Sequence, residues 1–357
     1  MRIAVTGASG NVGSALLRRL VAVEGHDVVG IARRTPDDST SPPFDHVQWV
    51  STDLTEDAGV PALTKAFDGV DAVVHLAWGF QPSHDQRYLE ELGVGGTRRV
   101  LEAVRAAGVG HLVHVSSVGA YSPKQDDAPV DESWPTRGVQ TSPYSRHKAA
   151  AERLLDAFEQ RGEEVVVSRM RPGIVGQGSA GSALLRYGLP ALVPSRAIGW
   201  LPVLPLDRRL RIPMVHADDV ADAIERVVGA RAPGAFNLSA RPTITTDVIA
   251  EVLRAHPVHV PSAAVRVAVS ASWHARIQPV DPGWLDLGFA VPLLDTGRAE
   301  RELGWSPTVD AVTVLRETID GMKKTRSDST PVLRPRTVPG QLLNALRRGP
   351  VSSRPRP

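Results

Sequence analysis

Three glycines near the start of the chain separate a short β-branched run from an apolar helical pattern. Residues 3–6 have the composition of a buried parallel strand. Gly7, Gly10 and Gly13 follow, and apolar residues then recur at helical spacing up to Leu20. Gly7 permits a sharp exit from the strand, Gly10 lets a pyrophosphate come close, and Gly13 lets helix and sheet pack tightly. This order of elements favours a dinucleotide-binding turn.

The start of the expected helix strengthens this interpretation. Backbone N–H groups around Asn11 and Val12 have no partner within the helix and attract phosphates. The glycine spacing is Gly-x-x-Gly-x-x-Gly, not the commoner Gly-x-Gly-x-x-Gly. A glycine-rich turn without a ligand is the alternative, and the position between strand and helix favours nucleotide binding.

Strand and helix patterns alternate along the first half of the chain. The clearest helical patterns cover residues 86–107 and 144–160, and candidate strands lie at 28–32, 47–52, 72–77, 111–116 and 165–169. Such alternation predicts an α/β fold with a doubly wound parallel sheet of the Rossmann type. A smaller mixed lobe, expected to bind the substrate, completes the C-terminal half.

The regular pattern weakens beyond residue 172 and returns briefly later. A strand-helix unit at 212–228 and a strand at 235–238 resemble the first half. We therefore expect residues 1–172 to form the dinucleotide-binding domain and 213–240 to return to it. The substrate lobe is then built from 173–212 and 241–322.

Composition limits the class of protein. Hydrophobic residues make up 42% and charged residues 22%, as in ordinary globular domains. The absence of cysteine excludes disulfides and thiol nucleophiles. No signal peptide precedes the first strand, and the apolar stretch at 197–206 contains two prolines and is too short for a bilayer. We expect a cytoplasmic protein without a transmembrane segment.

Basic residues collect at the C-terminal end. Residues 323–357 hold nine Lys or Arg and one acid, whereas the whole chain has a formal charge of only +2. The segment is rich in Pro, Ser and Arg and offers little to bury, which predicts a disordered tail. A solvated extension is the favoured interpretation, with contact to lipid, nucleic acid or protein as the alternative. No nucleic-acid partner is expected.

A tyrosine and a lysine four residues apart indicate chemistry. Tyr144 and Lys148 fall on one face of the helix expected at 144–160. A nearby cation lowers the pKa of a phenol and eases proton transfer to a substrate oxygen. A solvated pair on a helix surface is the alternative, and the glycine turn argues against it.

Nine short stretches together resemble the extended short-chain dehydrogenase/reductase superfamily, the group containing the NAD-dependent epimerases/dehydratases. The resemblance covers residues 1 to about 322, and its matching stretches are 6–13, 53–54, 75–77, 96–103, 114–117, Tyr144 with Lys148, 171–173, 215–220 and 303–307. It implies an oxidoreductase with a nicotinamide cofactor, a small-molecule substrate and a homodimer packed through the helices that include 144–160.

The resemblance also implies roles for individual residues. Tyr144 is the acid/base, Lys148 holds the ribose hydroxyls and lowers the Tyr144 pKa, and Ser117 bonds the substrate oxygen. Ser117 is preferred to Ser116 because it lies four residues before Tyr121. Cofactor contacts are implied for a further set: Gly7, Gly10, Asn11, Val12, Gly13, Asp53, Leu54, Ala77, Pro172, Gly173 and Ile174.

Several of these residues have a structural alternative. Asp53 either accepts a bond from adenine or caps the following turn, with equal weight. Trp78 either borders the active site or simply packs. His75 is interpreted as a packed strand residue, and His216 with Asp218 and Asp219 as a helix start rather than a metal site.

The end of the second strand bears on cofactor choice. No acid follows the glycines at 30–32, and Arg33 and Arg34 come next. A carboxylate there suits the ribose of NAD, whereas a guanidinium pairs with a 2′-phosphate. NADP is therefore preferred to NAD, with two merely exposed arginines as the alternative.

Two departures from the family pattern narrow the reaction. Residues 116–119 replace the Ser-Thr-Asp-Glu run of sugar dehydratases, so no carboxylate drives an elimination. Gly93 stands where many relatives have Asn. Any proton-relay or structural role of that Asn is therefore in doubt in this chain.

Three functions remain. The leading one is hydride transfer to or from a carbonyl or alcohol, with an apolar lining from 178–212 that includes Leu184, Leu185, Leu189, Leu192, Trp200 and Leu204. That segment has core or dimer packing as its alternative. A nucleotide-sugar epimerase with tightly bound NAD is second, with Arg208, Arg209 and Arg211 as diphosphate donors. A non-catalytic NADP-sensing regulator is third.

Overall fold

The computed structural model describes residues 1–357 except 38–40, 80–83, 163, 189–194, 279 and 337–357. Its main element is a seven-stranded parallel sheet in the order β11-β7-β5-β4-β1-β2-β3. The strands are β1 (Arg2–Thr6), β2 (Asp27–Ala32), β3 (Gln48–Ser51), β4 (Ala72–His75), β5 (His111–Val115), β7 (Val166–Pro172) and β11 (Gly234–Leu238). The predicted doubly wound α/β sheet is confirmed.

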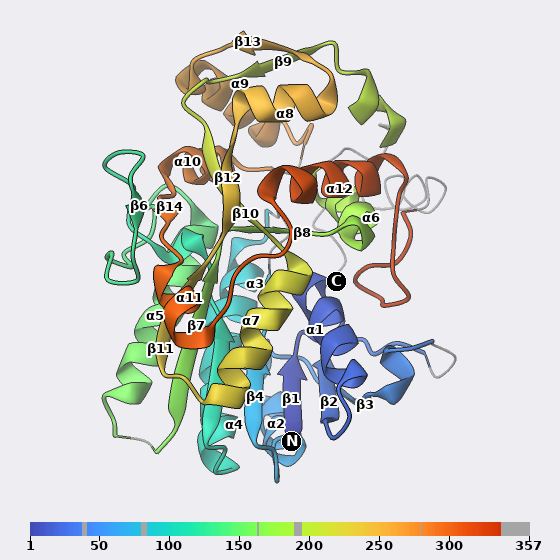
Figure 1. The fold of residues 1–357 in the computed structure, drawn as a ribbon, viewed down its shortest axis with the longest axis vertical. Coiled ribbons are helices and arrows are strands. Elements are labelled where there is room, and N and C mark those ends of the chain that lie inside the picture. The colour runs from blue at the N-terminus through green and yellow to red at the C-terminus, as the bar shows by residue number, and fades with distance from the viewer. Residues whose placement is uncertain (38–40, 80–83, 163, 189–194, 279, 337–357) are drawn as a thin grey trace.

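Helices cover both faces of this sheet (Figure 1). One face carries α1 (Asn11–Ala22), α7 (Ala217–Ala230) and α11 (Gly297–Leu303), and the other α2 (Val60–Ala66), α4 (Gly96–Ala106) and α5 (Pro143–Glu159). Short helices η1 (Phe44–His46), η2 (Asp57–Gly59) and η4 (Val118–Ala120) lie in the connections. Strands covered on both sides must be apolar throughout, as in the buried residues 72–74.

A second lobe lies beyond the carboxyl ends of the main strands (Figure 1). Its sheets are β12-β10-β8, from Ala240–Thr245, Arg211–His216 and Ile174–Gly176, and β13-β9, from His256–His259 and Val203–Leu206. Its helices are η5 (Gly178–Ala180), α6 (Gly181–Gly188), η6 (Ser195–Trp200), α8 (Thr246–Leu253), α9 (Ser262–His274), α10 (Pro282–Ala290) and α12 (Ala311–Lys323). The pair β6 (Pro129–Val130) and β14 (Leu293–Leu294) joins it to the first domain.

The helix expected over 86–107 has an interruption. Between α3 (Gln86–Glu90) and α4, residues Glu91–Gly95 form a π-helix, η3. Gly93 lies at its centre, and a Cβ on Gly93 would stand 2.9 Å from the Trp78 indole. A side-chain contact, which helical periodicity does not reveal, therefore accompanies the wider turn.

The predicted disorder from residue 323 onward is wrong for residues 323–336. Thr330 and Leu333 are buried, and the Thr330 hydroxyl donates to the Ser9 carbonyl at 2.8 Å. The composition is poor in apolar groups, but this segment uses backbone and hydroxyl partners instead. Residues 337–357 lie outside the described part of the chain.

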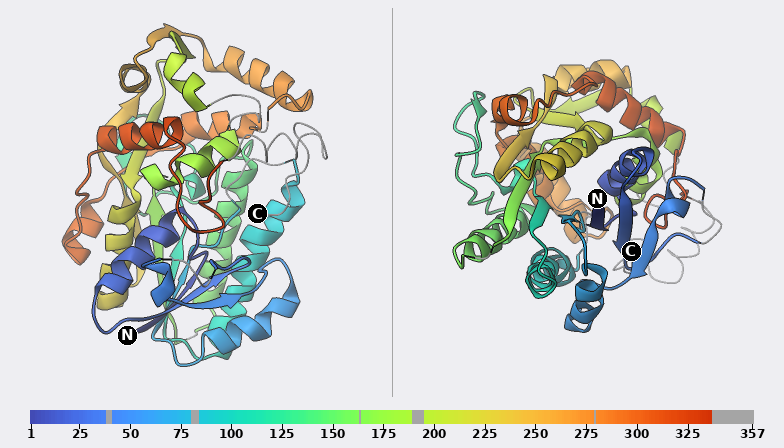
Figure 2. Two further views of the ribbon diagram at one scale, coloured as in Figure 1. Left: turned by 90° about the vertical axis from the view of Figure 1, so that its right-hand side faces the viewer. Right: turned by 60° about the horizontal axis from the view of Figure 1, so that its bottom comes forward.

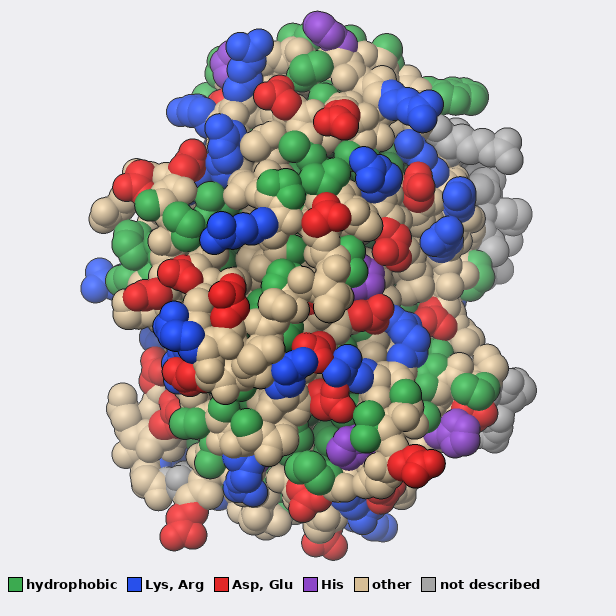
Figure 3. Space-filling view, viewed as in Figure 1, with side chains coloured by type: hydrophobic (Ala, Val, Ile, Leu, Met, Phe, Trp, Pro, Cys, Tyr) green, Lys and Arg blue, Asp and Glu red, His purple; other side chains and the backbone are tan. Residues whose placement is uncertain are grey.

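The surface in Figure 3 mixes acidic and basic side chains over both lobes. Among the described residues, no helix combines the length and apolar character needed to cross a bilayer.

Two helical glycines give a direct test of the packing of α12. A Cβ on Gly321 would lie 2.2 Å from the Gly178 carbonyl oxygen, whereas one on Gly229 in α7 meets nothing within 4 Å. We expect Gly321→Ala to lower the free energy of unfolding by about 1–3 kcal/mol through overpacking. Gly229→Ala, the control, raises it by up to about 1 kcal/mol. Equal values for the two variants in chemical denaturation would contradict the close contact.

Candidate active site

The glycine turn has the geometry that its spacing predicts. Gly7 has a φ of +72°, and a Cβ there would lie 2.6 Å from the backbone nitrogen of Ala77. A Cβ on Gly13 would lie 2.4 Å from the Ala8 carbonyl oxygen. A Cβ on Gly10 would lie 3.2 Å from the Gly7 carbonyl oxygen. The fold itself therefore requires glycine at positions 7 and 13, and position 10 faces the space in front of the turn.

Helix α1 begins directly behind this turn. Its N-cap, Gly10, contributes no side-chain hydrogen bond, so the first N–H groups of the helix point toward the turn without a side-chain cap. The Asn11 amide is held from the other lobe, since its Nδ2 donates to the Val175 carbonyl at 3.1 Å and Gln177 donates back to its Oδ1 at 2.8 Å. Backbone N–H groups, and not the Asn11 side chain, are therefore the donors available at this turn.

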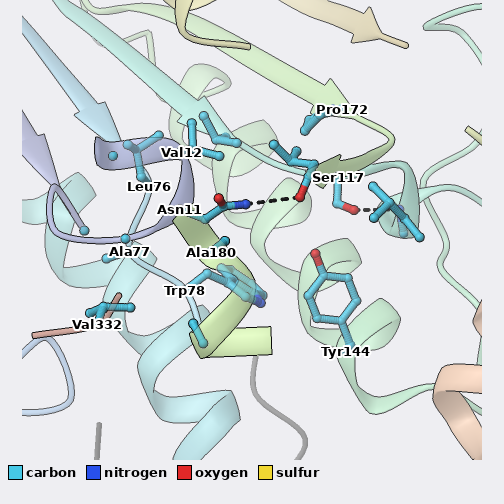
Figure 4. A pocket seen from close by; sticks show the side chains of 18 of the residues that line it. Asn11, Val12, Leu76, Ala77, Trp78, Ser117, Tyr144, Pro172, Ala180 and Val332 are labelled. Atoms are coloured by element: carbon cyan, nitrogen blue, oxygen red, sulfur yellow. Dashed lines mark hydrogen bonds between the residues drawn. The ribbon is translucent and has the colours of Figure 1, made fainter. Parts of the chain in front are cut away.

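A cavity of about 500 Å³ runs from the glycine turn to Tyr144. Its wall includes all the site residues predicted from the sequence: Gly7, Gly10, Asn11, Val12, Gly13, Arg33, Arg34, Asp53, Leu54, Ala77, Ser117, Tyr144, Lys148, Pro172, Gly173 and Ile174. Most of these residues lie at or just after the carboxyl ends of parallel strands, where ligands bind in open α/β sheets, and Tyr144 and Lys148 come from α5. Figure 4 shows one part of this wall, with Asn11 and Tyr144 on opposite sides.

Ser117 and Tyr144 meet at one end of this cavity (Figure 4). Ser117 caps η4, because its hydroxyl accepts from the Gly119 N–H at 3.0 Å. It also lines the cavity, so capping does not exclude a contact with a ligand. The Tyr144 ring packs edge-on against Trp78, with ring centroids 6.4 Å apart, and at a tilt of 34° against Trp284, with centroids 4.9 Å apart. Burial raises the pKa of Tyr144 to about 12, opposed by a hydrogen bond with Ser117. The phenol is therefore neutral at neutral pH.

The expected lowering of the Tyr144 pKa by Lys148 is wrong for this structure. The Lys148 Nζ instead donates to the Val115 carbonyl at 3.0 Å and lies 3.7 Å from the centroid of the Trp78 ring. Burial lowers the pKa of Lys148 itself to about 7, opposed by the charge of Glu152. For Tyr144 the loss of solvent outweighs the hydrogen bond with Ser117, and for Lys148 it outweighs the charge of Glu152. The spacing of residues along a helix does not show how deeply they are buried.

A buried ion cluster fixes the helix that carries both groups. Glu152 lies one turn beyond Lys148 on α5 and is completely buried. Arg171 donates to it through Nε and Nη2, both at 2.9 Å, and Arg169 through Nη1 at 3.1 Å. The Ser116 hydroxyl donates at 2.6 Å. Ser116 is thus committed to Glu152, and Ser117 is the serine beside Tyr144.

The other end of the cavity carries charge. The Asp53 Oδ1 accepts from the backbone and hydroxyl of Thr55 at 2.9 and 2.8 Å, so Asp53 stabilises the turn as well as lining the cavity. Its Oδ2 lies 3.8 Å from Arg33 Nη1, which also donates to the Tyr88 hydroxyl at 3.0 Å. Arg34 lines the same cavity.

Trp78 lines the cavity and also packs against its neighbours, so both of its interpretations fit the structure. Its indole lies against Lys148 and Tyr144, and the missing side chain of Gly93 leaves room for it. Any side chain at position 93 would require Trp78 to shift, because a Cβ there would stand 2.9 Å from the indole. The glycine at position 93 therefore allows the Trp78 indole to occupy its observed position.

The histidines have structural environments. His75 shares hydrogen bonds with the hydroxyls of Thr6 at 2.6 Å and Thr97 at 3.2 Å, and burial lowers its pKa to about 3. It is a neutral packed strand residue, as expected. His216 caps α7, and Asp219 accepts from Thr308. The described residues contain no group of three His, Cys, Asp or Glu placed to hold a metal.

The substrate end of the cavity differs from the predicted lining. Of the residues named from 178–212, Leu184 lines the cavity, whereas Leu185 lies in the core, Trp200 is 78% exposed and Leu204 is half-buried in β9. Leu189 and Leu192 lie outside the described residues. The apolar residues that line the cavity from α10, its C-cap and β10 were not predicted from the sequence. They are Trp284, Leu287, Val291, Ile212 and Met214. The spacing of Trp284, Leu287 and Val291 on one helical face was the available signal.

The arginines proposed for a diphosphate have other partners. Arg209 pairs with Asp207 at 2.8 Å. Arg211 donates to the carbonyls of Arg208 and Leu210, both at 2.8 Å. Neither these two nor Arg208 lines the cavity.

Comparisons with known proteins bear on the family and the fold of the chain. The profile of the NAD dependent epimerase/dehydratase family matches residues 3–239. A UDP-glucose 4-epimerase of Mycolicibacterium smegmatis is 29% identical over 335 residues, covering 90% of this chain and 98% of its own. A sterol-4-alpha-carboxylate 3-dehydrogenase of Candida albicans is 28% identical and covers 62% of each chain. The fold is similar to that of a Thermus thermophilus UDP-glucose 4-epimerase in complex with NAD, with a TM-score of 0.67, 23% identity, and coverage of 90% and 99%.

The buried amine of Lys148 gives a prediction on stability. Its pKa is 10.5 when exposed and about 7 in the folded protein, so between these values the unfolded chain binds more protons and stability rises with pH. Below the folded pKa the full cost of burying the ammonium is present. We expect the free energy of unfolding of Lys148→Met to be about 2–4 kcal/mol higher than that of the unmodified chain near pH 6. This difference should shrink as the pH rises toward about 10.

Lys65→Met, at an exposed position of α2, is the matched control and leaves the pH dependence unchanged. Urea denaturation across this pH range measures the difference. A Lys148→Met protein that is less stable near neutral pH, or whose difference does not vary with pH, would show that the amine is not desolvated.

Proposed function

The chain belongs to the NAD dependent epimerase/dehydratase family, and we propose on that basis that it is an NAD(P)-dependent oxidoreductase. It moves a hydride between the cofactor and a carbonyl or alcohol of a small molecule, using a Ser117-Tyr144-Lys148 site. The observation that carries this proposal is the single cavity that joins these three side chains to the glycine turn.

The residues present fit a nicotinamide dinucleotide. The N–H groups at the start of α1 suit a pyrophosphate, and Gly10, which has no side chain, lets it come close to the backbone. Pro172, Gly173 and Ile174 line the cavity with Ser117 and Tyr144, and Asp53, Leu54 and Ala77 line it as well. When bound, the cofactor supplies or accepts the hydride.

The protein's own contribution is to manage charge on the substrate oxygen. Ser117 and Tyr144 donate hydrogen bonds to the carbonyl oxygen, where negative charge grows as hydride adds to the carbon. Tyr144 then gives its proton and leaves an alcohol. Its raised pKa keeps the phenol in the donor form, and the amine of Lys148, with a pKa near 7, can hold or release a proton close by.

The apolar end of the cavity supports an uncharged substrate. Trp284, Leu287, Val291 and Met214 form it. Among the described residues that line the cavity, the cations are Arg33, Arg34 and Lys148, and none of them belongs to the substrate lobe. A nucleotide-sugar diphosphate needs such donors where it binds. This lining favours an apolar ketone or alcohol.

A nucleotide-sugar epimerase with tightly bound NAD is the second candidate. The similarity to the M. smegmatis epimerase along nearly the whole chain favours it. An epimerase returns the hydride, so it keeps its cofactor and shows no net consumption of NAD(P)H. A non-catalytic NADP-sensing regulator, the third candidate, predicts that biological output survives the loss of Tyr144.

We propose NADP rather than NAD as the preferred cofactor, because Arg33 and Arg34 follow the second strand and no acid stands there. We also propose that residues 1–172 with 213–240 form the cofactor-binding domain and that 173–212 with 241–322 form the substrate lobe. Strand β10 crosses this boundary, because it pairs within the sheet of the second lobe. We also propose that the enzyme works in the cytoplasm and forms a homodimer packed through α5. Light scattering of the purified chain tests whether it is a dimer.

Loss of the phenol separates catalysis from binding. We expect Tyr144→Phe to reduce turnover by about 10²- to 10⁴-fold, because the proton donor is lost, while the Kd for the cofactor stays within about twofold. The assay is a panel of apolar ketones, alcohols and nucleotide sugars with NADPH and NADH, following cofactor absorbance and product isomers. Tyr121→Phe, a buried phenol outside the cavity, is the control. Undiminished turnover in Tyr144→Phe would rule out this mechanism.

The two arginines determine the expected cofactor preference. Replacing Arg33 and Arg34 together by Ser removes the guanidinium partners of a 2′-phosphate. We expect the Kd for NADPH to rise about 10- to 100-fold and that for NADH to change little. Arg87→Ser, an exposed position on α3, is the control. Equal weakening of both cofactors would contradict a role in 2′-phosphate binding.

A further inference from the structure

The segment after α12 leaves the substrate lobe and runs to the glycine turn. In Figure 2 it is the red loop that descends from α12 past the start of the chain's first helix. Its upper part is held by α6: the Ser182 N–H donates to the Arg326 carbonyl at 2.8 Å, and the Ser182 hydroxyl to the Thr325 carbonyl at 2.7 Å. Farther along, the Arg186 guanidinium donates to the carbonyls of Val332 and Arg334.

The lower part of the same segment is held by the dinucleotide-binding domain. The buried Thr330 hydroxyl donates to the Ser9 carbonyl, within the glycine turn, at 2.8 Å. The Asp328 carboxylate lies 3.6 Å from the Arg18 guanidinium on α1. One stretch of chain therefore bridges two elements, α6 and the turn before α1, that stand on either side of the cavity.

Apolar side chains of this bridge face the cavity. Val332 and Leu333 are part of its wall, as are Gly10 and Ala77, and Figure 4 places Val332 near Ala77. Leu333 is buried and packs with Ala180, Ala183 and Leu184. A tight turn presents these two residues, closed by bonds from the Asp328 N–H to the Leu333 carbonyl at 3.0 Å and from the Leu333 N–H to the Thr330 hydroxyl at 3.2 Å.

We propose that residues 326–336 are a strap that forms the outer wall of the dinucleotide site and slows exchange of the bound cofactor. This rests on the proposed function, in that the occupant of the glycine turn is a dinucleotide. A cofactor seated over Gly10 lies behind Val332 and Leu333. To leave, it must wait until the contacts of Thr330 with Ser9 and of Asp328 with Arg18 open.

Cofactor release from the full-length chain measures the strap without any knowledge of the substrate. The full-length chain, a chain ending at Arg336 and a full-length Asp328→Asn/Thr330→Val variant are loaded with NADPH, and release is followed by fluorescence after displacement. We expect the chain ending at Arg336 to match the full-length protein. The double variant should release NADPH at least about tenfold faster, since interface changes act mostly on the off-rate. Circular dichroism confirms that the variants are folded.

A second measurement uses the unaltered chain, so it does not depend on the folding of any variant. Hydrogen exchange of the amides in 326–336 should slow when NADPH is added, whereas those in α9 should not change. Release within twofold in all three proteins, or unchanged exchange in 326–336 on a chain that binds NADPH, overturns the strap and leaves the proposed function standing. A full-length chain that binds neither NADPH nor NADH overturns both.

Discussion

One buried carboxylate determines where the reactive side chains lie. Glu152 is fully enclosed, and a buried charge is tolerated only when donors surround it. Arg171 and Arg169 come from β7, and Ser116 follows β5, so the ion cluster joins α5 to two strands of the sheet. Because Tyr144 and Lys148 stand two turns and one turn earlier on the same helical face, the cluster also sets their position at the cavity.

Burial then sets the charge of both groups. Tyr144 keeps its proton, and Lys148 is poised near neutrality, because neither is well solvated. Trp78 covers the amine and packs on the phenol, in space that Gly93 leaves open. Such desolvation lowers the stability of the folded chain, and functional sites commonly lose stability in favour of activity.

Local patterns in the sequence were sufficient for the sheet, the glycine turn and the pairing of Tyr144 with Lys148, because each depends on short-range spacing. Most of the other predicted cavity residues came from the family resemblance, and the apolar wall from α10 and β10 was missed. The predictions that failed depend on burial and on partners that spacing does not show. The pKa of Tyr144 follows from burial, Arg209 is taken by its neighbour Asp207, and Thr330 reaches Ser9 across the whole chain. Composition cannot reveal such a partner, so the segment around Thr330 was predicted to be disordered.

A crystal structure of the chain with NADPH tests the central claim most directly. The account predicts the pyrophosphate at the N–H groups of Asn11 and Val12, the ribose hydroxyls within hydrogen-bond distance of Lys148, and the nicotinamide ring facing Ser117 and Tyr144. A cofactor seated elsewhere, or a ring turned away from the phenol, would contradict the assignment of this cavity as a site of hydride transfer.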